Sequence, residues 1–190
     1  MFLACLVSVP CYLFVLYIIF KYRAQSPFNS SFFAIAFNLG ILDVIHLVED
    51  WLLGKFPAYA WLGMHNLVMI DPGLFSKAYN MLFWYVSLCQ INGVLSLAIN
   101  RLCVAGYKQR WNNKVTGAVI AMTWLTPIPV VIPQAFFHYD YQPKQNGGVV
   151  YQWLNEWQQQ LYFLLCGCWC ALVVVVCATC YLMLFIKVRE

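Results

Sequence analysis

The sequence predicts an all-α, multispan transmembrane helix bundle. Of its 190 residues, 63% are hydrophobic and only 9% are charged, whereas a soluble domain carries about 25% charged residues. The mean hydropathy is +0.70, and long uncharged runs separate the few charged side chains, which indicates that lipid surrounds most of the chain. The net charge is +4, but the basic residues are scattered between apolar runs and do not form the patch that binds nucleic acid.

Five regions are long enough to cross a bilayer. A hydrocarbon core about 30 Å thick needs roughly 20 apolar residues in a helix that rises about 1.5 Å per residue. We expect a single transmembrane domain over residues 1–190, and its second span is the least apolar because it contains Asp43, His46, Glu49 and Asp50. The expected spans are residues 2–20, 31–53, 75–101, 115–137 and 157–186.

The positions of lysine and arginine predict the orientation, because short cytoplasmic loops carry the excess of these residues. One side of the expected bundle holds only Lys55, Lys77 and Lys144. The other side holds Lys21, Arg23, Arg101, Lys108, Arg110, Lys114, Lys187 and Arg189. We therefore expect a multi-pass plasma-membrane protein with an extracellular N-terminus. A cleaved signal peptide fits residues 2–20 less well, because the positive charge of a signal peptide precedes its apolar run.

The cysteines and histidines do not predict a metal site or an enzyme. All nine cysteines lie in or beside apolar segments, where a thiol behaves as a small hydrophobic group. Cys166, Cys168 and Cys170 occupy alternate positions of one expected helix and point apart instead of converging on an ion. His46, His65 and His138 are scattered, and no nucleophile motif stands out. We expect no cofactor. The cysteines are Cys5, Cys11, Cys89, Cys103, Cys166, Cys168, Cys170, Cys177 and Cys180.

Glycines and prolines mark the expected loops and helix breaks. Ser26-Pro27 precedes the second span, and Asp71-Pro72-Gly73 marks an outer loop. Asn146-Gly147-Gly148 predicts a long outer loop between the fourth and fifth spans. The fourth span contains Pro127, Pro129 and Pro133, which bend or end a membrane helix.

Asp43 is expected about half-way through the second span. An ionisable residue at this depth costs about 2.5–3.5 kcal/mol on insertion scales, so it usually faces the bundle interior and has a function. Asp43, His46 and Asp50 follow a spacing of i, i+3 and i+7 and share one face of a helix. Two interpretations stay open: Asp43 forms hydrogen bonds to neighbouring helices, or it forms an ion or proton site coupled to a conformational change.

A face of the third span carries aromatic residues at its outer end. Seven residues follow alternating steps of three and four and therefore share this face: Tyr79, Phe83, Val86, Gln90, Gly93, Leu97 and Asn100. We expect an outward-facing pocket for a small, largely apolar ligand. Its expected lining is Tyr79, Phe83, Gln90, His46 and Tyr162. Ordinary helix packing is the alternative interpretation of each aromatic residue.

Three motifs resemble those of rhodopsin-like G protein-coupled receptors. Residues 38–43, Asn-Leu-Gly-Ile-Leu-Asp, resemble the second-helix pattern of that superfamily, and residues 100–102, Asn-Arg-Leu, resemble its third-helix Asp-Arg-Tyr motif. Trp124 and Pro133 look like the tryptophan and proline of its fourth helix. Pro10 and the phenylalanine-rich start of the second span resemble nematode serpentine chemoreceptors of the class gamma or class V type, with the chain truncated after the fifth helix.

This resemblance implies roles for several residues. Asp43 corresponds to the sodium-site aspartate, and Asn100 and Arg101 lie where the superfamily meets a heterotrimeric G protein. The chain departs from the pattern because Asn100 and Leu102 replace the acid and the tyrosine of the third-helix motif. It also lacks the usual outer disulfide, since Ser76 stands at the likely third-helix position and residues 137–156 contain no cysteine.

We therefore expect a chemosensory receptor, in full or as a fragment, that lies in the lipid bilayer. The resemblance implies that it binds a small extracellular ligand and transmits a signal to a G protein. The alternative is a small transporter or channel subunit in which Asp43, His46 and Asp50 form a proton or cation path, although no paired halves or inverted repeat are visible in the sequence.

Overall fold

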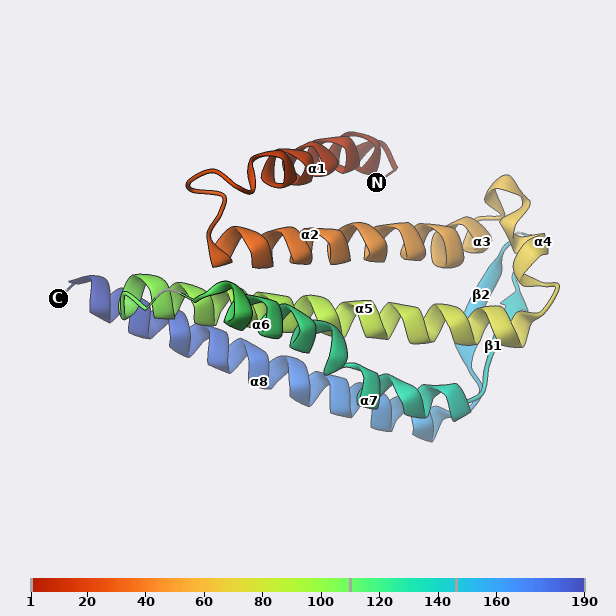
Figure 1. The fold of residues 1–190 in the computed structure, drawn as a ribbon. Helices are drawn as coiled ribbons and strands as arrows, with labels where there is room; N and C mark the ends of the chain where they lie inside the picture. Colours follow the sequence, from red (N-terminus) through yellow and green to blue (C-terminus); the bar gives the residue numbers. More distant parts are fainter. Residues whose placement is uncertain (1, 110, 146, 190) are drawn as a thin grey trace. The chain divides into compact units, whose positions relative to one another are not determined.

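The computed structural model describes residues 2–109, 111–145 and 147–189. The loop residues Arg110 and Asn146 lie outside the described residues, as do the side chains of residues 2–8, Cys5 among them. The described chain is helical apart from one two-stranded hairpin (Figure 1). The long helices are α1 (Phe2–Tyr22), α2 (Ser31–Glu49), α5 (Pro72–Arg101), α6 (Asn113–Leu125) and α8 (Glu156–Arg189).

Shorter elements extend or connect the long helices. The π-helical segments are η1 (Asp50–Lys55) and η3 (Leu102–Gly106), which follow α2 and α5. The short α-helices are α3 (Phe56–Ala58), α4 (Met64–Val68) and α7 (Ile128–Val131). The 3-10 helices are η2 (Trp61–Gly63) and η4 (Ile132–Phe136), and the strands are β1 (Tyr139–Pro143) and β2 (Val149–Trp153).

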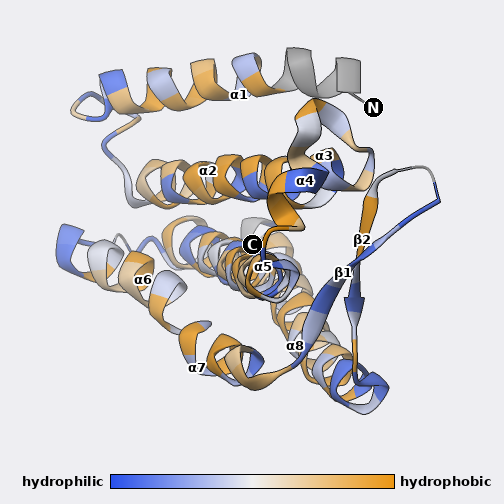
Figure 2. Cartoon of the chain, turned by 90° about the vertical axis from the view of Figure 1, so that its right-hand side faces the viewer, coloured by the Kyte–Doolittle hydropathy of each residue, from blue (hydrophilic) through white to orange (hydrophobic). Residues whose placement is uncertain are grey.

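Four helical stretches among the described residues are long and apolar enough to cross a membrane. They are Ser31–Ala58, Pro72–Gly106, Asn113–Phe136 and Glu156–Lys187. The apolar stretch Val9–Tyr22 is shorter and belongs to α1, the helix that coincides with the first expected span. Figure 2 shows that hydrophobic residues dominate the long helices, whereas the connection between β1 and β2 is mainly hydrophilic.

Side-chain caps explain where three of the helices begin. Asp71 Oδ1 accepts a hydrogen bond of 3.0 Å from Leu74 N just before α5. Asn112 Oδ1 accepts one of 2.8 Å from Val115 N at the start of α6. Asn155 Oδ1 accepts one of 3.1 Å from Trp157 N at the start of α8. Each cap satisfies a backbone N–H that has no partner inside its helix.

The prolines of the fourth expected span interrupt it as the sequence predicts. The α-helix α6 ends at Leu125, a turn follows, and α7 and η4 continue the stretch in shorter pieces. Pro127 lies in the turn, where its carbonyl oxygen accepts hydrogen bonds of 3.0 Å from Val130 N and Val131 N. A proline has no backbone N–H to donate to the preceding turn, which accounts for the break.

The described residues fall into two compact units. The first contains residues 2–44, 89–125 and 171–189, apart from residue 110. Its buried residues include Ile35, Leu42, Cys89 and Ala98. A Cβ at Gly40 would clash with the Leu16 side chain, and one at Gly93 would lie 3.0 Å from Leu39 Cδ1. Small residues at these positions therefore let α2 pack closely against α1 and α5, as is common between membrane helices.

The second unit contains residues 45–88 and 126–170, apart from residue 146. Its core is aromatic, with Tyr139, Trp153 and Tyr162 buried in one cluster and Tyr141 buried in another. The side chains of Asn80 and Gln134 form a buried hydrogen bond.

The expected long outer loop contains an antiparallel hairpin. Tyr139 pairs with Trp153 and Tyr141 with Tyr151, and the loop closes with a 2.7 Å hydrogen bond from Lys144 N to Gly148 O. A Cβ at Gly148 would clash with the carbonyl oxygen of Ala58, so glycine is needed where the hairpin meets α3. The sequence predicted a long loop here and did not anticipate the two strands, in which alternate aromatic residues give each strand a buried face.

Candidate functional site

The carboxylate of Asp43 accepts hydrogen bonds from two other helices in the first unit. Gln90 Nε2 on α5 donates to Oδ1 at 2.7 Å, and the Tyr12 hydroxyl on α1 donates to Oδ2. Both partners are donors, which suits a group that can only accept. Sequence reasoning missed Tyr12, which has no distinguishing pattern in an apolar span. It placed Gln90 in the ligand pocket, where its role stays a prediction.

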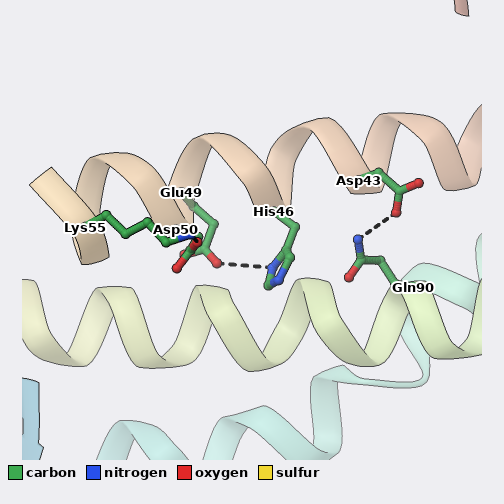
Figure 3. A network of polar contacts seen from close by, with 6 residues as sticks. All are labelled: Asp43, His46, Glu49, Asp50, Lys55 and Gln90. Carbon is green, nitrogen blue, oxygen red and sulfur yellow. Dashed lines mark hydrogen bonds and ion pairs between the residues drawn. The ribbon is translucent and has the colours of Figure 1, made fainter. Parts of the chain in front are cut away.

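The other polar residues of the second expected span have separate partners (Figure 3). His46 Nδ1 lies 3.3 Å from Glu49 Oε1, and Lys55 pairs with Asp50. Both pairs belong to the second unit. No group of three or more metal-ligating side chains occurs in the part of the chain that the structure describes.

Four of the expected pocket residues form a chain of ring contacts in the second unit. His46 and Phe83 have ring centroids 5.1 Å apart, and Phe83 and Tyr79 are 5.9 Å apart. Trp84 connects this group to Tyr162, with centroid distances of 5.7 Å to Phe83 and 5.0 Å to Tyr162. Gln90 is not part of this cluster, because it belongs to the first unit.

The hairpin contributes residues that sequence reasoning did not assign to the site. Tyr151 packs edge-on against Tyr79 at 5.8 Å, and Trp153 packs against Tyr162 at 6.0 Å. The Tyr141 hydroxyl donates a hydrogen bond of 2.5 Å to the Leu53 carbonyl oxygen. Burial raises the pKa of Tyr141 and Tyr151 above the ordinary value of a phenol. The hairpin is thus fixed to the aromatic cluster by ring contacts and to the Leu53 carbonyl by one side-chain hydrogen bond.

Asn100 and Arg101 lie at the end of α5 in the first unit. Asn100 is 1% exposed, and its Nδ2 donates a hydrogen bond of 2.9 Å to Ser31 Oγ at the start of α2. Arg101 is exposed, and its guanidinium carbon lies 4.8 Å from the ring centroid of Phe32, within the range of a cation–π contact.

A cavity of about 550 Å³ adjoins Asn100 and Arg101. The rest of its lining comes from loop residues before α2, the first residues of α2, and Val104, Ala105, Trp111 and Asn113. The polar groups that line the cavity are hydroxyls, amides and the Arg101 guanidinium. Groups of these kinds can bind the main chain and the charged ends of a peptide segment. The resemblance pointed to Asn100 and Arg101, but the cavity itself was not predicted, because its other walls depend on how the helices pack.

Trp124 lies on α6, and the sequence gives no partner for it. In the structure its Nε1 donates a hydrogen bond of 2.8 Å to Asn38 Oδ1 on α2. Asn38 is 8% exposed. The two residues come from two of the motifs that carry the resemblance, the second-helix pattern and the fourth-helix tryptophan. Their contact joins these motifs within the first unit.

Comparisons with known proteins agree with this arrangement. The family "Serpentine type 7TM GPCR chemoreceptor Srv" matches residues 1–190. A relative in Caenorhabditis elegans, serpentine receptor class V-1, is 24% identical over 159 residues, which cover 76% of this chain and 47% of that receptor. The crystal structure of squid rhodopsin superposes with a TM-score of 0.66 at 14% identity, covering 90% of this chain and 50% of that one.

The chain spans about half the length of both proteins. The likeness to squid rhodopsin concerns the fold alone. The family match covers the helices that carry Asp43, Trp124 and Arg101. This chain belongs to the Srv family of serpentine chemoreceptors and is a multi-pass membrane protein of the G protein-coupled receptor class.

Proposed function

We propose that this chain acts in a chemosensory receptor that binds a small extracellular ligand and couples to a heterotrimeric G protein on the cytoplasmic side. The single observation that carries the coupling is the position of Arg101. Arg101 is exposed at the end of α5, its guanidinium stacks on Phe32, and it lines a cavity of about 550 Å³. The role of this protein is thus that of a receptor and not of an enzyme.

The sidedness of the basic residues supports the orientation that this function needs. Eight of the 11 lysines and arginines fall on the side that includes Arg101, so this end faces the cytoplasm under the positive-inside rule. The N-terminus is then extracellular and the membrane is the plasma membrane. An epitope tag on the N-terminus that antibodies reach on intact cells would support this orientation.

The aromatic cluster of the second unit supports ligand binding at the extracellular end. Tyr79, Phe83, His46 and Tyr162 belong to it, and aromatic side chains with a few polar groups are typical of sites for small ligands. In this proposal Gln90 and Asp43 form a polar site in the first unit, where sodium or a proton affects the response to ligand.

Binding of a purified heterotrimeric G protein to the chain in lipid nanodiscs tests the coupling. Arg101→Ala should weaken binding roughly tenfold or more, as expected when an interface arginine is truncated. Arg189→Ala is the matched control, because Arg189 also stacks on a phenylalanine, Phe185, with its guanidinium carbon 4.2 Å from the ring centroid. The control should bind like the wild type.

Two results would contradict the proposal. The first is that the wild-type chain does not bind the G protein. The second is that both arginine variants lose binding to the same extent, which would indicate a general effect of positive charge. Surface expression of Arg101→Ala is measured in parallel, because its loss would indicate a role in folding.

A further inference from the structure

Glu49 is the only charged residue in the buried core of the described chain. It is 4% exposed, and neither of its carboxylate oxygens has a hydrogen-bond partner. Burying a carboxylate without compensation costs several kcal/mol, so a charge or a proton is expected to reach it. Sequence reasoning noted Glu49 in the second span but gave it no role.

The neighbours of Glu49 compensate its negative charge only when His46 is protonated. Asp50 forms an ion pair with Lys55 and also accepts a hydrogen bond from Tyr79. The imidazole of His46 is 3.3 Å from Glu49, but it carries a positive charge only when it is protonated. With a neutral His46, the two acids and one lysine have a net charge of −1.

Aromatic rings from α5 and the hairpin lie on the same side as this charge. Phe83 contacts His46, and Tyr79 contacts both Phe83 and Tyr151. The Tyr141 hydroxyl of the hairpin lies close enough to Glu49 that the carboxylate adds to the burial that raises the pKa of Tyr141. Aromatic faces attract cations through their quadrupole, so these rings and the carboxylate favour the same kind of partner.

The choice of side chains favours an organic cation over a metal ion. A metal ion is held by several carboxylate, imidazole or carbonyl groups, and the described residues contain no cluster of three such side chains. One carboxylate beside several rings suits a singly charged ammonium group on an apolar body, because the rings also bury that body.

We propose that Glu49 is the counter-ion of an organic ammonium ligand, with Tyr79 and Phe83 as the aromatic surfaces that its cation contacts. This inference rests on the proposed function, because it places the ligand in the aromatic cluster of the second unit. It adds the chemical class of the ligand, a protonated amine, and it gives Glu49 rather than Asp43 the role of binding it.

A pair of probes that differ in charge tests the proposal. The chain in nanodiscs is titrated with 2-phenylethylamine, which is protonated at neutral pH, and with 2-phenylethanol, which has the same body without the charge. The wild type should bind the amine roughly 10- to 100-fold more tightly than the alcohol, as expected for a hydrogen bond to a charged group. The amine should also raise the thermal unfolding midpoint.

Variants at position 49 separate charge from shape. Glu49→Gln should bind the two probes with equal affinity, and Glu49→Asp should retain a preference for the amine, because it keeps the charge on a shorter side chain. Glu156→Gln is the matched control, since Glu156 is exposed in the first turn of α8. It should behave like the wild type.

Three results would overturn the proposal. They are equal binding of amine and alcohol by the wild type, binding of neither probe, and an amine preference that persists in Glu49→Gln. The G protein assay with Arg101→Ala reports the proposed function separately, so the receptor assignment survives any of these results. A midpoint that responds to pH but not to the amine would show that His46 alone compensates Glu49, and it too would overturn the proposal.

Discussion

Gln90 and Asp43 are joined by a 2.7 Å hydrogen bond between α5 and α2, while the Tyr12 hydroxyl donates to the other carboxylate oxygen. Asp43→Asn replaces one carboxylate oxygen with an NH₂ group. This group is a donor, and it would face either the Gln90 amide or the Tyr12 hydroxyl, which also donate. We expect the free energy of unfolding to fall by about 1–3 kcal/mol. Thermal unfolding in nanodiscs measures this, with Glu156→Gln as the exposed control.

The same variant separates the receptor from the transporter alternative. If Asp43 modulates a receptor, Asp43→Asn changes the response to ligand or to sodium and neither creates nor abolishes an ion current. Flux measurements in proteoliposomes check this. A current or proton flux carried by the wild type and lost in Asp43→Asn would favour the transporter.

Trp124→Phe should weaken the contact between α6 and α2. The variant keeps an aromatic ring but removes the indole N–H that donates to Asn38. The expected loss is about 0.5–1.5 kcal/mol in the free energy of unfolding, because hydrogen bonds between membrane helices are of modest strength. Trp157→Phe, at a side chain that is 67% exposed, should leave the unfolding midpoint unchanged.

Tyr141→Phe should loosen the hairpin without unfolding the helices. It removes the hydroxyl that donates to the Leu53 carbonyl oxygen and leaves the ring in place. Hydrogen exchange of the amides in residues 139–153 should become faster by roughly five- to tenfold, which corresponds to a loss of about 1 kcal/mol. Tyr59→Phe, at a residue that is 62% exposed, is the control, and equal acceleration in both variants would contradict the role of Tyr141.

Alkaline pH should destabilise the hairpin. Burial raises the pKa of Tyr139, Tyr141 and Tyr151, all of which lie outside the candidate spans. Their contribution to stability is complete below a pH of about 10, the ordinary pKa of tyrosine. It is lost as the pH rises above that value, because the unfolded chain releases these protons first.

Tyrosinate absorbance and the unfolding midpoint follow this titration together. In the folded protein, part of the tyrosinate signal should appear at higher pH than in the denatured protein. If the folded and denatured chains give the same titration curve, burial does not raise the pKa of the three phenols and the prediction is wrong.

Apolar length and charge position were sufficient to predict a helical membrane bundle, because both are local properties of the chain. The prolines located the break after Leu125. The hairpin required a nonlocal pattern, since Tyr139 and Tyr141 become a buried face only when they pair with Trp153 and Tyr151. Its alternating aromatic residues were the signal that could have revealed it.

The partners of the polar residues could not be predicted from the sequence. Spacing places Gln90 and Tyr79 on one face of a helix, but it does not determine which neighbouring helix each residue meets. That choice depends on the rotation and separation of whole helices, which close contacts such as Gly93 against Leu39 help to set. Tyr12 contacts Asp43 and Ser31 contacts Asn100 because of how the helices pack. No local motif identifies either residue.

The hairpin from Tyr139 to Trp153 contains no sulfur, and phenol groups, rings and a main-chain carbonyl hold it against the rest of its unit. Thiol reductants therefore have no bond to break there. A hairpin held in this way keeps its fold whether its surroundings are oxidising or reducing.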